Sequence, residues 1–119
     1  MNKVNIAEKF SLFSEHWRPK LVGRINDMDV RLAKLIGEFV WHKHDHEDEM
    51  FLVIKGRLLM QFRDREVWVE PGEFIIVPHG VEHRPVAPEE VHLMLIEPSE
   101  TVNTGDVVNE RTVRHIETI

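Results

Sequence analysis

The chain has 119 residues, with 42% hydrophobic and 30% charged residues, a formal net charge of -6 and no cysteine. These values are typical of a globular protein with one core, and we expect a single domain over residues 1–119. They exclude disulfides and thiolate ligands, and the acidic balance without a basic patch argues against a nucleic-acid partner. The N-terminus has no secretory pattern and no apolar run is long enough to cross a bilayer, so we expect a cytoplasmic protein without a membrane partner.

The first predicted element is a short amphipathic helix over residues 5–14. Asn5 and Glu8 have the spacing of a capping box, and Ile6, Phe10 and Phe13 recur at helical spacing. We expect this helix to act either as a lid over the core or as a plug at one end of it.

Residues 20–97 have the pattern of short β-strands. Runs rich in Val, Ile, Leu, Phe and Trp alternate with turns that contain Gly, Pro, Asn or Asp. Without a crossover helix, this spacing favours an antiparallel sandwich or barrel. The predicted strands are residues 21–25, 30–36, 38–44, 49–55, 57–63, 66–70, 73–78, 83–87 and 91–97.

Two of these strands, 49–55 and 73–78, are apolar on both faces. One face should line the core, and the other needs a cover from a partner subunit or from another part of the same chain. We therefore expect a homodimer and keep the intrachain cover as the alternative.

The alternation weakens beyond Pro98, so residues 98–119 are predicted to form a C-terminal arm. Apolar positions between residues 112 and 119 could add an edge strand or a docking turn. His115 in this arm is expected at the surface.

The chemical centre of the sequence is the run VWHKHDHEDEMFLVIKG, residues 40–56. His42 and His44 are two apart on a predicted strand, so their imidazoles share one face. Glu49 begins the next strand, where a hairpin could bring its carboxylate beside them, and His83 follows a turn that could hold it against the same pocket. Imidazoles with one carboxylate suit Mn, Fe, Co, Ni, Cu or Zn, and the spacing does not choose among these metals.

The alternative is that residues 42–49 form an exposed hairpin turn whose ionisable groups are hydrated. His46 and His79 are expected in solvated turns. His92, which lies among large apolar residues, is expected to be a core or pocket imidazole rather than a ligand.

Two motifs then resemble those of the cupin superfamily. GEFVWHKHDHEDEMFLVIKG, residues 37–56, is similar to the first cupin motif, with matches at His42, His44, Glu49 and Gly56. GEFIIVPHGVEHRPVA, residues 72–87, is similar to the second motif, with matches at Gly72, Pro78, Gly80 and His83. Gly37 lies one residue nearer the first histidine than usual, and Ala87 stands where an Asn usually closes the second motif.

This resemblance implies an all-β fold, an antiparallel jelly-roll β-barrel over about residues 20–97. It also implies a divalent metal held by His42, His44, Glu49 and His83, and often a homodimer. Within the superfamily, the chain looks most like small single-barrel proteins labelled as mannose-6-phosphate-isomerase-like, a label that does not identify a substrate. Six residues are candidates for the pocket wall, of which at most about half can face inward on alternating strands: Trp41, Phe51, Met60, Phe62, Phe74 and Met94.

Three functions are compatible with these features. The first is a metal-dependent enzyme of small-molecule metabolism, either an oxygenase or an isomerase that uses the ion as a Lewis acid. The second is a binding module that holds a metal and a small ligand to sense or sequester it, and the third is a structural domain whose site is empty in the cell. The catalytic residues are unknown from sequence, and the nominated acids and bases are Glu38, Glu82, Arg84 and His92.

Overall fold

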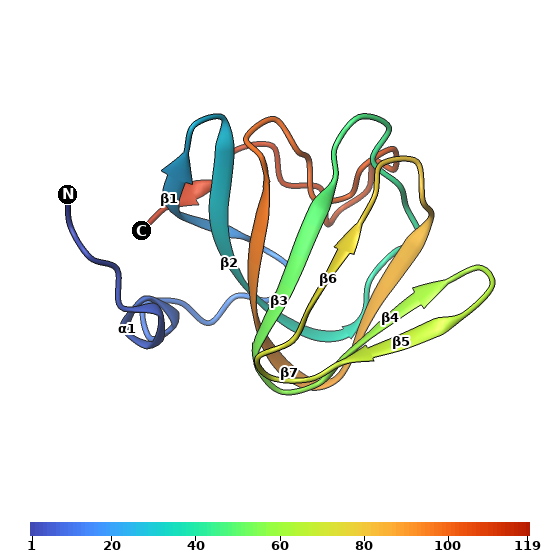
Figure 1. Ribbon diagram of the computed structural model, residues 1–119, viewed down its shortest axis with the longest axis horizontal. Coiled ribbons are helices and arrows are strands. Elements are labelled where there is room, and N and C mark those ends of the chain that lie inside the picture. Colours follow the sequence, from blue (N-terminus) through green and yellow to red (C-terminus); the bar gives the residue numbers. More distant parts are fainter.

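The computed structural model describes all 119 residues, and its main secondary structure is the antiparallel β-strand, preceded by one short helix (Figure 1). This all-β jelly roll confirms the predicted fold class. The sheet does not close on itself, because β5 and β6 each pair along one edge only. The elements are α1 (Ile6–Phe10), β1 (Lys20–Ile25), β2 (Met28–Glu38), β3 (Glu49–Lys55), β4 (Leu58–Phe62), β5 (Glu66–Val69), β6 (Phe74–Val77), β7 (His83–Pro98) and β8 (Glu117–Thr118).

Strand β7 is the axis of the fold. Its first residues pair with β4, its later residues pair with β3, and β2 runs antiparallel to both halves. Between these halves, the β2–β7 register shifts at Leu35/Gly37, and Gly37 adopts a φ of 79°. A glycine tolerates this left-handed backbone, and such a bulge bends a sheet. One long strand thereby contributes to two walls of the core.

The core lies between these walls and comes from alternating side chains. On β7, Val91, Leu93 and Leu95 are buried, and they belong to a cluster of 12 buried apolar residues. Phe51 and Val53 on β3 belong to the same cluster. Loss of one large aliphatic side chain from such a core typically costs about 2–5 kcal/mol, so this cluster fixes the frame that carries the site.

The N-terminal helix is shorter than predicted and ends at Phe10. The Asn5 side chain accepts a hydrogen bond from the Glu8 backbone N–H at 3.0 Å, as the capping pattern predicts. Phe10 is buried and stacks on His92, with ring centroids 4.4 Å apart. The side chain of His92 points away from the core, opposite to its inward-facing neighbours on β7. The helix therefore packs on the outer face of the sheet, and none of its residues lines the cavity described below.

The predicted strand at 38–44 is wrong for most of its length. Residues 40–48 are irregular apart from a single bridge between His42 and His83. The backbone there is nevertheless held on two sides. The His42 N–H donates to the His83 carbonyl at 3.1 Å, and the Lys43 N–H donates to Asp106 Oδ1 at 2.9 Å.

The strands predicted at 83–87 and 91–97 form the single strand β7. The C-terminal arm crosses the top of the view in Figure 1 and returns to the sheet, where β8 pairs in parallel with β1. His115 is exposed, as predicted.

Candidate metal centre

The structure brings together the four residues that the motifs single out, His42, His44, Glu49 and His83. Each offers one ligand atom, and these atoms all lie within 4.8 Å of one another. All four residues are at most 4% exposed. The alternative of a hydrated surface turn is therefore wrong for these four side chains.

Two of the imidazoles are oriented by their own backbone. His42 Nδ1 lies 2.9 Å from the Val40 carbonyl oxygen, and His83 Nδ1 lies 2.9 Å from the Val81 carbonyl oxygen. A carbonyl only accepts hydrogen bonds, so each Nδ1 carries the proton and each Nε2 keeps a free lone pair. This arrangement fixes the tautomer and ring orientation that a metal ligand needs.

Several polar atoms at the centre of the cluster are buried without a hydrogen-bond partner. They are both ring nitrogens of His44, Oε1 of Glu49 and Nε2 of His83. The nearest approaches are His44 Nε2 to Glu49 Oε1 at 3.1 Å and His83 Nε2 to Glu49 Oε1 at 3.7 Å. Each unsatisfied buried group typically costs about 1–3 kcal/mol. A divalent cation among them would satisfy these atoms, so the residues present fit a metal.

The pKa values of the candidate ligands are shifted by burial and by their neighbours in the cluster. Burial, with the nearby His83, lowers the pKa of His42 to about 4, which keeps this imidazole neutral near pH 7. Burial also lowers the pKa of His44, but the contact with the Glu49 carboxylate outweighs it and raises the pKa overall. Burial raises the pKa of Glu49, yet the adjoining Glu97 carboxyl, His44 and His83 outweigh it and hold this pKa well below the usual value.

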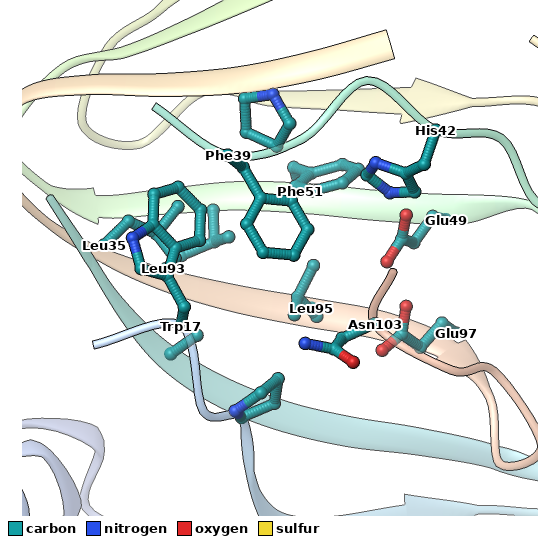
Figure 2. A pocket seen from close by; sticks show the side chains of 13 residues that line it. Trp17, Leu35, Phe39, His42, Glu49, Phe51, Leu93, Leu95, Glu97 and Asn103 are labelled. Atoms are coloured by element: carbon teal, nitrogen blue, oxygen red, sulfur yellow. The ribbon is translucent and has the colours of Figure 1, made fainter. Parts of the chain in front are cut away.

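A second carboxyl group lies beside the centre. Glu97 is fully buried on β7, and its carboxyl faces that of Glu49 (Figure 2). Its Oε1 accepts a hydrogen bond from Arg31 Nη1 at 2.9 Å, and Arg31 is itself 1% exposed and paired with Asp29 at 2.9 Å. Burial and the Glu49 charge raise the pKa of Glu97 well above its usual value.

Sequence reasoning missed Glu97 as a site residue. The sequence feature that could have identified it is its position along the strand. Leu93 and Leu95 face the core on β7, and Glu97, two residues further on, faces the same way. An acidic residue at an inward position of a strand is uncommon unless it is paired or functional.

An apolar cavity of about 40 Å³ adjoins the two carboxyl groups. Figure 2 shows its aromatic and aliphatic walls, with the polar groups gathered at one end. Of the six predicted wall residues, only Phe51 lines it. The lining residues are Trp17, Pro19, Ala33, Leu35, Phe39, His42, Glu49, Phe51, Pro85, Leu93, Leu95, Glu97 and Asn103.

The nominated acids and bases lie outside this cavity. Glu38 pairs with Arg84 at 3.4 Å, and Glu82 pairs with Arg63 at 3.2 Å, both near the surface. His92 lies 3.3 Å from Glu90 on the outer face. None of the nominees is placed to act beside the centre.

The remaining predicted wall residues and histidines have other surroundings. Met60 is in the core cluster, Phe74 is exposed on β6, and the guanidinium of Arg63 lies 3.9 Å from the ring centroid of Trp41. His46 and His79 are exposed, as predicted.

The sequence from residue 32 to residue 98 matches the Cupin domain family. The chain belongs to the cupin family. Its predicted membership is thus confirmed, and the match spans both motifs and the strands between them. No helix in the structure has the length and apolar character needed to span a membrane.

The chain is also similar to two solved structures and to one curated protein. A cupin-2 domain containing protein from Shewanella frigidimarina is 46% identical, with a TM-score of 0.79 over 80% of this chain and 93% of that one. Protein NMB1881 from Neisseria meningitidis is 29% identical, with a TM-score of 0.76 over 82% of this chain and all of that one. The uncharacterized protein YdbB of Bacillus subtilis is 38% identical over 66% of this chain, which spans 65% of that protein's length.

Proposed function

We propose that this cupin binds one divalent transition metal through His42, His44, Glu49 and His83, and acts on a small molecule held in the adjoining cavity. The observation that carries the proposal is the set of buried, unpartnered nitrogen and oxygen atoms that point at one centre. The ion would supply a Lewis acid for a substrate oxygen. The donor set accommodates Mn, Fe, Co, Ni, Cu or Zn.

The position of Glu97 favours an enzyme over a passive binding module. A reaction that moves protons needs an acid or base beside the reacting atoms. Glu97 is the carboxyl group that lines the cavity next to Glu49, and its Oε2 atom has no hydrogen-bond partner. An isomerase that uses the metal as a Lewis acid fits this arrangement better than an oxygenase does.

Elemental analysis tests the metal site. Wild-type protein expressed with added metal should hold about one ion per chain, the stoichiometry of a single closed ligand set. His42→Ala with His44→Ala should lose it while the far-UV circular dichroism stays unchanged. The matched control is His46→Ala with His79→Ala, which removes two exposed histidines. A wild type without metal, or a control that loses as much metal as the test variant, would refute the proposal.

The predicted homodimer also belongs to this proposal. Outward-facing apolar residues lie in two cross-strand rows over β6, β3 and β7. One row is Ile76, Met50 and Ile96, and the other is Phe74, Leu52 and Met94. Phe74 and Ile76 are 59% and 55% exposed, so a second copy could bury them.

A further inference from the structure

The cavity beside the candidate metal centre has a polar end and an apolar end. Glu49 and Glu97 lie at the polar end, and the ring of Trp17 lies at the far end, beyond Phe39 and Leu95 (Figure 2). A ligand that turns a polar head toward the candidate metal centre must therefore place its remaining atoms among apolar side chains, and the row of these side chains ends at Trp17.

The volume of the cavity limits how much of a ligand can enter. It is about 40 Å³, which is room for roughly three water-sized groups. A methylene group is similar in size to a water molecule, so an aliphatic tail of roughly three carbon atoms fills the cavity.

The end wall at Trp17 comes from a part of the chain outside the family match. That match begins at residue 32, whereas Trp17 lies between α1 and β1. The side walls include Leu93 and Leu95 of β7, which lie inside the match. The length of the cavity is therefore set by a segment that this chain adds to the shared frame.

Several contacts hold the Trp17 ring in place. Its backbone N–H donates to the Lys34 carbonyl oxygen and its Nε1–H donates to the Ile36 carbonyl oxygen, each at 2.9 Å. The ring stacks on Phe39, with centroids 4.6 Å apart and planes at 14°, and the Arg111 guanidinium lies 5.3 Å from its centroid. The backbone φ of Trp17 is 62°, and a bulky residue keeps this left-handed conformation only where its surroundings enforce it. The ring is thus a fixed wall.

We propose that Trp17 is the specificity-determining residue of this cavity and limits the ligand to a polar head with an unbranched aliphatic tail of about three carbon atoms. The inference rests on the proposed function, because the head would face the bound cation. A longer tail would have to displace the ring, and this would break its stack with Phe39 and its hydrogen bond to Ile36. Trp17 is itself only half-buried, so removal of its ring would open the cavity toward solvent and give a longer tail room to extend.

1-Propanol and 1-hexanol make a matched pair of probes, because both are neutral, carry one hydroxyl head and differ only in the length of the tail. Zinc-loaded protein would be titrated with each alcohol by NMR, and nuclear Overhauser contacts to the methyl groups of Leu93 and Leu95 identify binding in the cavity. Each buried methylene normally raises affinity about fourfold, so a site without an end wall would bind 1-hexanol roughly sixtyfold more tightly. We expect the wild type to bind 1-hexanol no more tightly than 1-propanol, and Trp17→Ala to bind it at least about tenfold more tightly.

The control variant is Trp68→Ala, which removes the same side chain at a residue that is 42% exposed and lies outside the cavity. It should keep the wild-type preference. Trp17→Phe keeps an aromatic ring against Phe39 but is smaller, so its preference should lie between those of the wild type and Trp17→Ala. If Trp17→Ala does not fold, Trp17→Phe decides.

Metal content is measured on every sample. A wild type that binds 1-hexanol in the cavity more tightly than 1-propanol, or binds neither alcohol there, would overturn the inference and leave the metal site standing. A Trp17→Ala protein with the wild-type preference would do the same. A wild type that retains no zinc would overturn the proposed function, and the preference of the metal-free protein would still decide the role of Trp17.

Discussion

At the scale of single residues, the candidate ligands differ in how strongly they hold a proton. The pKa of His42 is lowered to about 4, so a proton does not compete for this imidazole near neutral pH. The pKa of His44 is raised above 6.5 by Glu49, so a proton does compete there. Only a neutral imidazole binds a metal, and a protonated His44 must therefore release its proton when the metal binds.

The affinity for zinc should consequently fall as the pH drops through the raised pKa of His44. The zinc affinity falls with decreasing pH because, below that pKa, the metal-free protein binds one more proton than the metal-bound protein does. The expected loss is about tenfold per pH unit, beginning above pH 6.5, with no further contribution from His42 until about pH 4. Competition with a chelator of known pH dependence between pH 8 and pH 5.5 measures it. An affinity that stays constant over this range would contradict the expected role of His44.

Residue spacing predicted the convergence of His42, His44, Glu49 and His83, because strand parity and motif spacing constrain which side chains can meet. The same parity places Glu97 on the inward face of its strand, but it did not identify this residue as part of the site. The Glu97 carboxyl is held in place by its hydrogen bond with Arg31, which is 66 residues away in the sequence. A contact between residues so far apart leaves no local pattern in the sequence. Long-range ion pairs of this kind become visible only when the strands β2 and β7 are placed side by side.

At the scale of elements, the C-terminal arm packs against the segment that carries two of the ligands. Asp106 N–H donates to the Lys43 carbonyl oxygen at 3.0 Å, and Asp106 Oδ1 accepts from the Lys43 N–H. The arm approaches closely because Gly105 has no Cβ. An added Cβ would lie 2.2 Å from the Lys43 carbonyl oxygen and 3.1 Å from His42 Cδ2.

Gly105→Ala should therefore push the arm away from the ligand segment. We expect a loss of stability larger than the roughly 1–2 kcal/mol that a left-handed non-glycine residue costs alone, together with weaker zinc binding because His42 loses its packing. Gly72→Ala is the matched control, since Gly72 has a φ of 82° but no atom within 4 Å of its added Cβ. Urea unfolding and chelator competition measure the two effects. Equal losses in both variants would show that the arm does not support the site.

The sequence predicted some elements better than others for physical reasons. Strand 49–55 was predicted to the residue, because its continuous apolar run lies between an acidic turn and Gly56. The prediction of a strand at 38–44 was wrong, although His42 and His44 do share one buried side, as predicted. Alternation reports which side chains are buried, and His42 and His44 are buried through a single bridge and contacts with the arm.

The C-terminal arm was hard to predict from the hydrophobic pattern of the sequence, because its structure is stabilised mainly by polar contacts. Thr104 and Thr112 share a hydrogen bond between their hydroxyl groups at 2.7 Å, and the Asn103 side chain accepts one from the Val113 N–H at 2.8 Å. Such contacts have no hydrophobic period. The arm was therefore predicted as a segment, and its internal turns were not.

At the scale of the whole molecule, the fold has an inner face that carries the site and an outer face that is only partly covered. The N-terminal segment covers the part of the outer face near β2, where Leu32 is fully buried and Lys34 Nζ donates to the Phe13 carbonyl oxygen. The rows over β6, β3 and β7 lack such a cover, since Phe74 and Ile76 are more than half exposed. The intrachain cover therefore accounts for the part of the outer face near β2, and the homodimer stays a prediction for the rows over β6, β3 and β7.

A homodimer through these rows is the expected state in solution. The β6 edge also lacks a strand partner, so apolar side chains and free backbone groups lie together there. Light scattering at micromolar concentration should report twice the chain mass, and Ile76→Glu should shift the protein to a monomer because it would bury an unpaired charge in the interface. Ile25→Glu is the control, since Ile25 is 59% exposed at the β1–β2 turn. A monomeric wild type would refute the dimer, and a dimer that survives Ile76→Glu but not Ile25→Glu would move the interface to the other edge of the sheet.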